Sequence, residues 1–61
     1  MRLLSSTDVA IALAAKAGTL RLTVRASRLG GTYAAIEDAI GVIEVQNTLA
    51  EAEARVAGCV R

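Results

Sequence analysis

Three arginines, Arg21, Arg25 and Arg28, are spaced four and three residues apart in the first half of the chain. Lys16 precedes them. On a helix, this spacing places the three guanidinium groups on one face. A guanidinium group donates paired hydrogen bonds to a phosphate or to the N7 and O6 atoms of a guanine. These four cations are therefore the residues that we expect to contact DNA.

The charges are unevenly divided along the chain, although the formal net charge is only +1. Residues 1–30 hold five cations and one acid, whereas residues 31–61 hold two cations and five acids. This asymmetry predicts either a basic surface for a polyanion or an internal match between the halves. In a helical hairpin, Arg28 would face Glu37 and Arg21 would face Glu44. Such exposed pairs contribute about 0.2–1 kcal/mol each, and both interpretations stay open.

Residue types that support catalysis are scarce. The chain has no histidine, and Cys59, its one cysteine, lies near the chain end without an evident base beside it. No glycine-rich loop precedes a Lys-Ser/Thr pair, and no residues have the spacing of metal ligands. We therefore expect no enzyme activity, no cofactor, and no catalytic or metal-binding residue.

The longest strongly apolar stretch, residues 9–15, is too short to span a bilayer, so we expect no membrane association. A single free cysteine suits a reducing compartment. The expected location is the cytoplasm.

The length of 61 residues predicts a single domain over residues 1–61. A chain this short buries only about 60% of its unfolded surface, so its own core is marginal. Small domains commonly add disulfides, a metal or self-association. One cysteine cannot form an internal disulfide, so we expect a homo-oligomer such as a homodimer.

A first helix is predicted over residues 6–17. Ser5 and Asp8 have the spacing of a capping box, in which each side chain accepts from the other's backbone N–H. Lys16 suits the negative end of the helix dipole, and Gly18 is a natural left-handed stop.

Residues 19–29 fit two structures. As a helix capped by Thr19, the segment shows one basic stripe and one apolar stripe. As a strand over 19–27, it alternates between an apolar set and a polar set: Leu20, Leu22, Val24 and Ala26, against Arg21, Thr23, Arg25 and Ser27. No second strand is evident, so such a strand would pair only with its copy in a dimer. We therefore prefer the helix.

After Gly30 and Gly31, apolar and small residues recur at steps of three and four as far as Ala57. This heptad spacing predicts one long amphipathic helix over 32–57 that self-associates as a coiled coil. The predicted oligomer interface comprises Tyr33, Ile36, Ile40, Ile43, Asn47, Leu49 and Ala50. The expected fold class is all-α, a helical oligomer of two short helices and one long helix.

The order of residues within 9–29 resembles the helix-turn-helix of small phage-type repressors and excisionases. Leu13-Ala14 matches the small residue of the first helix, Ala17-Gly18 matches the turn, and Val24 matches the β-branched residue of the second helix. Ser27 departs from the pattern, because an apolar packing residue is expected there. The resemblance implies a helix-turn-helix at 6–29, transcription regulation, and three arginines on the outer face of a recognition helix.

The expected function is that of a small, non-enzymatic, oligomeric helical binding protein. The most specific form of this hypothesis is a DNA-binding regulator that uses a basic helix at 19–29. The alternative is a structural, assembly or inhibitory protein that docks on a protein partner through its apolar helical faces.

Overall fold

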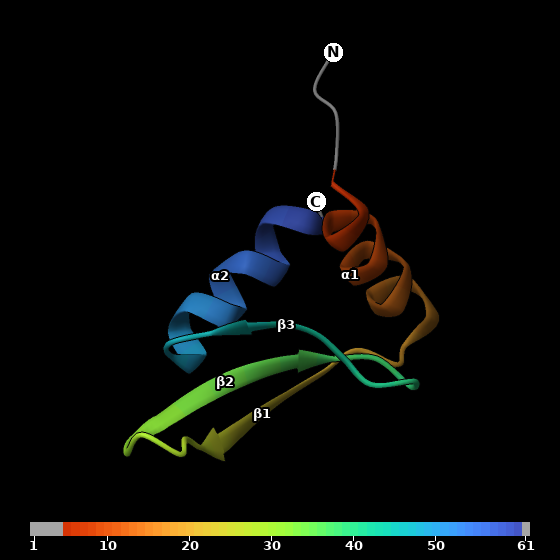
Figure 1. The fold of residues 1–61 in the computed structure, drawn as a ribbon. Coiled ribbons are helices and arrows are strands. Elements are labelled where there is room, and N and C mark those ends of the chain that lie inside the picture. Colours follow the sequence, from red (N-terminus) through yellow and green to blue (C-terminus); the bar gives the residue numbers. More distant parts are fainter. Residues whose placement is uncertain (1–4, 61) are drawn as a thin grey trace.

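The computed structural model describes residues 5–60. Its elements in chain order are α1 (Ser6–Ala17), β1 (Arg21–Ala26), β2 (Thr32–Glu37), β3 (Val42–Gln46) and α2 (Leu49–Cys59). The strands form one antiparallel sheet in the order β1-β2-β3, and both helices lie on the same side of it (Figure 1). The fold is α+β, so the predicted all-α class is wrong.

Helix α1 confirms the prediction for residues 6–17. The Ser5 side chain accepts from the backbone N–H of Asp8 at 3.1 Å, and the Asp8 carboxylate accepts from the N–H of Ser5 at 3.2 Å. Gly18 ends the helix with φ 77°, a left-handed conformation that side chains with a Cβ disfavour. Each of these signals lies within a few residues of the helix end that it determines.

The helix predicted over 19–29 is wrong, and the alternative of a strand is correct. Residues 21–26 form β1, which pairs with β2 rather than with a second copy. The turn between them begins at Ser27, whose hydroxyl accepts from the backbone N–H of Leu29 at 3.2 Å. Gly30 and Gly31 continue it with φ 98° and 75°. The segment that the helix-turn-helix resemblance makes a recognition helix is therefore a strand and its turn.

The long coiled-coil helix predicted over 32–57 is also wrong. Residues 32–46 form β2 and β3, and helix begins only at Leu49. Between the strands, the Asp38 carboxylate accepts from the backbone N–H groups of Ile40 at 2.8 Å and Gly41 at 2.9 Å, a turn that asparagine and aspartate favour. Thr48 then caps α2 by accepting from the N–H of Glu51 at 3.1 Å.

The core lies between one face of the sheet and the two helices. Ile36 and Ala34 of β2 are fully buried against Ile11 of α1 and Ala52 of α2. Leu22 of β1 packs at the margin of this cluster. Alternation along each strand therefore directs the other set of side chains to the uncovered face. Neither helix within residues 5–60 is long and apolar enough to cross a membrane.

Candidate nucleic-acid interface

The polar side chains of β1 lie on the uncovered face of the sheet. The strand register places Arg21 beside Glu37, Thr23 beside Ala35, and Arg25 beside Tyr33. On the other side of β2, Ala35 lies beside Val45 and Glu37 beside Val42. We call this surface the open face; it comprises Arg21, Thr23, Arg25, Tyr33, Ala35, Glu37, Val42 and Val45.

Arg25, Glu37 and Thr23 form a hydrogen-bonded group at the centre of the open face. Arg25 Nη2 donates to Glu37 Oε2 at 2.6 Å, and the Thr23 hydroxyl donates to the same oxygen at 2.6 Å. The hydrogen bond from Thr23, followed by that from Arg25, lowers the pKa of Glu37 below its ordinary value. Glu37 is 9% exposed, whereas the Arg25 side chain is 48% exposed. The guanidinium group thus stays accessible while the carboxylate holds it on the face.

Arg21 and Arg28 complete the basic side of this surface. Arg21 is exposed at the start of β1, and Arg28 is exposed in the turn that joins β1 to β2. Among residues 5–60, the ion pairs of the structure include neither of them. Lys16 lies instead in the last turn of α1, within the helix layer. The open face therefore holds two of the four cations predicted to contact DNA, Arg21 and Arg25, and Arg28 lies in the turn beside it.

The ion pairs predicted between the two halves of the chain are not formed. Glu37 was the expected partner of Arg28 but pairs with Arg25. Glu44 was the expected partner of Arg21 but accepts from Arg55 Nε at 2.9 Å and Arg55 Nη2 at 3.1 Å. The hairpin that would have aligned them is a three-stranded sheet, and its register brings different residues together.

Arg55 lies at the centre of a second group of charges, which sequence reasoning missed. Besides Glu44 of β3, it pairs with Asp8 of α1 and donates to the Cys59 sulfur at 3.1 Å. The hydrogen bonds from Arg55 are the largest cause of the lowered pKa of both Asp8 and Glu44. We call Asp8, Glu44, Arg55 and Cys59 the Arg55 cluster. It ties together α1, β3 and α2, and every charged member has a partner.

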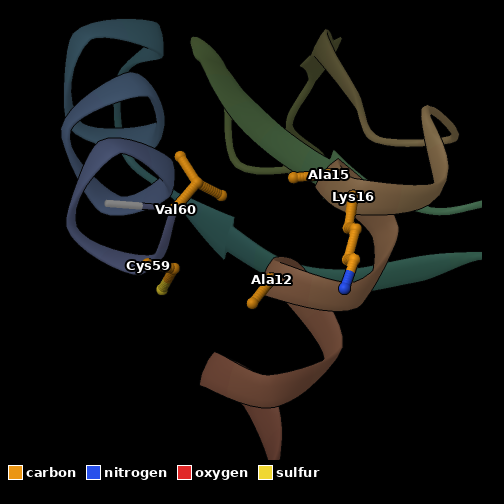
Figure 2. A pocket seen from close by; sticks show the side chains of 5 residues that line it. All are labelled: Ala12, Ala15, Lys16, Cys59 and Val60. Atoms are coloured by element: carbon orange, nitrogen blue, oxygen red, sulfur yellow. The ribbon is translucent and has the colours of Figure 1, made fainter.

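A shallow groove of about 520 Å³ lies between α1 and the end of α2. Figure 2 shows its lining, with Ala12, Ala15 and Lys16 on one side and Cys59 and Val60 on the other. The polar groups here are one amine and one thiol, and the thiol already bonds to Arg55. Within residues 5–60, no three His, Cys, Asp or Glu side chains form a metal-binding group. The groove presents no arrangement for general acid–base catalysis.

The residues predicted to form the oligomer interface are distributed over several surfaces. Ile36 is fully buried in the core, and Ile43 packs against it. Ile40, in the turn after β2, is 97% exposed. Tyr33 lies on the open face, whereas the remaining three residues surround the start of α2: Asn47, Leu49 and Ala50. These seven residues do not form one continuous contact surface, because they lie on two strands, in a turn and around the start of α2 rather than on one helix.

Comparison of the chain with protein-family models, with curated proteins and with solved structures finds no match. The geometry of the open face is therefore the basis for a functional proposal.

Proposed function

We propose that this protein is a small, non-enzymatic DNA-binding protein that contacts the duplex with the open face of its sheet. The observation that carries the proposal is the position of three arginines. Arg21 and Arg25 project from β1 on the side away from the helices, and Arg28 lies in the adjoining turn. Their exposure and their charge suit phosphate and guanine contacts.

The placement of the acids supports this orientation. Glu51 and Glu53 lie on α2, across the sheet from the open face (Figure 1). Asp8 and Glu44 are paired with Arg55 in the layer between sheet and helices. Among residues 5–60, only Glu37 adds a carboxylate to the open face, and Arg25 pairs with it. A duplex on the open face would meet mostly positive charge, and its phosphates would be attracted to that side.

The shape of the β1–β2 pair also suits a groove. The major groove of B-DNA admits a two-stranded β-ribbon, and several DNA-binding proteins read bases from strands rather than from a helix. At the middle of this ribbon, Thr23 lies beside Ala35. Ala35 is fully buried, so contact with the bases would come from the side chains around it, chiefly Thr23 and Arg25. The basic strand thus takes the role that the sequence assigned to a basic helix.

A regulatory role and a location in the cytoplasm belong to the same proposal. Contact with DNA is the basis for the first, and the free thiol of Cys59 is the basis for the second.

The direct test is a fluorescence anisotropy titration of a labelled mixed-sequence duplex at low salt. The variant Arg21→Ala/Arg25→Ala/Arg28→Ala should bind weakly. The slope of the logarithm of its binding constant against the logarithm of salt concentration should become shallower by up to about 2.7, because each phosphate that is no longer neutralised removes about 0.9. The control Lys16→Ala removes a positive charge from the helix layer and leaves the open face intact. It should bind nearly as well as the wild type. Equal losses in both variants, or no binding by the wild type, would refute the proposal.

A second candidate function is docking on a protein partner, and one apolar surface favours it. Leu13 of α1 is 62% exposed, and it lines a groove together with Ile40 of the β2–β3 turn. A photo-crosslinking residue at position 40 should then trap one defined protein from cell extract. The same residue at Glu53, on the acidic side of α2, should not. Identical adducts from both positions would exclude this surface as the docking site.

A further inference from the structure

Strand β1 is an edge of the sheet. In the order β1-β2-β3 it pairs with β2 on one side, and its outer side faces away from the helices in Figure 1. Its six residues pair without a bulge, and the whole chain contains no proline. Proteins usually protect an exposed edge with a bulge, a proline, an inward-pointing charge or a covering segment. Charged side chains also protect an edge, and β1 carries Arg21 and Arg25, but both lie on the open face; along its covered side the described part of β1 has none of these devices.

Val24 indicates that the core layer is incomplete along this edge. It lies on the covered face beside Ala34, which is fully buried. Val24 itself is 56% exposed, because the helices do not extend over it. An apolar side chain on the core side of an edge strand suits contact with another strand that continues the same layer.

Contact between β1 and another strand would add to a core that is small. Among residues 5–60, only Ile11 and Ile36 are large side chains that are fully buried. A chain of this size buries too little apolar surface to be more than marginally stable alone. Pairing with another copy extends the sheet and covers Val24.

We propose that two copies of the chain associate through their β1 strands, antiparallel and with Val24 opposite its counterpart, to form one six-stranded sheet. A two-fold contact of this kind closes on itself, because the same edge serves both copies. The inference depends on the edge of β1 and not on DNA binding.

The register follows from charge. Matching the covered faces of both copies allows either Thr23 or Val24 to lie on the two-fold axis. With Thr23 on the axis, Arg21 of one copy would lie opposite Arg25 of the other, and like charges directly opposite destabilise a strand pair. With Val24 on the axis, Arg25 lies opposite Thr23 of the second copy. Either register brings the two open faces together as one continuous surface, so the charges decide between them.

Sedimentation equilibrium separates this edge from other surfaces. Val24→Lys places two like charges opposite each other at the axis and should weaken the dimer by about tenfold or more. Val45→Lys is the matched control, because Val45 on the other edge strand is 54% exposed. It should leave the dimer intact. A monomeric wild type, or equal weakening by both variants, would overturn the proposal, with circular dichroism confirming that each variant is folded.

Disulfide trapping tests the register itself. In a Cys59→Ser background, Val24→Cys should form a linked dimer in oxidised glutathione, whereas Val45→Cys should not. In that exchange, two protein thiols are oxidised to one disulfide, and one oxidised glutathione is reduced to two thiols. Directly opposite Cβ atoms lie about 4.5–5.5 Å apart, close to the roughly 3.5–4.5 Å that a disulfide spans. Linking at position 45 but not at position 24 would contradict the proposed register, whatever the outcome of DNA titrations.

Discussion

The two faces of the sheet use arginine in opposite ways. On the covered side, Arg55 donates to Glu44 and Cys59 and pairs with Asp8, so its guanidinium group is committed to three elements of the fold. On the open side, Arg25 pairs with Glu37 but remains half-exposed, and Arg21 is exposed at the start of β1. An arginine with several partners stabilises the arrangement of elements, whereas an exposed arginine retains donors for a ligand.

The comparison separates stability from binding, so substitutions on the two faces should have different effects. Core and cluster residues should change the free energy of unfolding. Residues of the open face should change DNA affinity and leave the free energy of unfolding almost unchanged. Three substitutions probe this separation, in order of decreasing effect.

Ile36→Ala should have the largest effect. Ile36 is fully buried on the covered face, and truncating such a side chain typically costs about 2–5 kcal/mol. For a marginal domain, a loss of that size leaves much of the protein unfolded. Urea denaturation monitored by circular dichroism measures it. Val45→Ala, a half-exposed control on the open face, should stay within about 0.5 kcal/mol of the wild type. Similar losses in both variants would contradict the assignment of covered and open faces.

Arg55→Met should have the second-largest effect, and it should alter the pH dependence of stability. The lowered pKa values of Asp8 and Glu44 mean that both carboxylates favour the folded state above their unfolded pKa values. That contribution is lost as the pH falls through the folded pKa values. The melting temperature of the wild type should therefore fall as the pH drops below about 4.5.

The Arg55→Met protein should melt lower at neutral pH, because Asp8 and Glu44 are left near each other without a cation. It should also lose less on acidification, since its carboxylates no longer depend on Arg55. Scanning calorimetry between neutral and acidic pH measures both features. Parallel curves for the two proteins would show that the Arg55 cluster does not control acid stability.

Glu37→Gln should have the smallest effect on stability and a measurable effect on binding. Removing the carboxylate charge weakens the hold on Arg25 and makes the open face more positive. Affinity for a DNA duplex should rise by up to about fivefold. Glu53→Gln changes the net charge equally but lies on α2, so it should raise affinity less. An equal rise in both variants would point to net charge rather than to Arg25.

Local signals were enough to predict part of this fold. The capping box at Ser5 and the stop at Gly18 determine α1, and both act over a few residues. The polar alternation from Arg21 to Arg25 also identified the open face of β1 correctly, in the strand alternative. What prevented the preference for a strand was the absence of an evident partner strand.

Strands β2 and β3 were missed because the spacing of their apolar residues fits a helix as well as a strand. Tyr33, Ile36, Ile40 and Ile43 recur at helical spacing, but Tyr33 and Ile36 lie on opposite faces of β2. The turn formed by Asp38 interrupts the helix pattern, and this signal was present in the sequence. The Arg55 cluster is different, because it joins Asp8 to Arg55 across most of the chain. Only the folded topology brings those residues together.

The central claim is that the open face binds DNA, and backbone amide shifts in a titration with a mixed-sequence duplex test it most directly. At constant protein concentration, shifts should concentrate in residues 21–31, which comprise β1 and its turn. Residues 51–58 of α2 should change little, because they lie across the sheet (Figure 1). Shifts confined to α1 and α2, with residues 21–31 unchanged, would contradict the account.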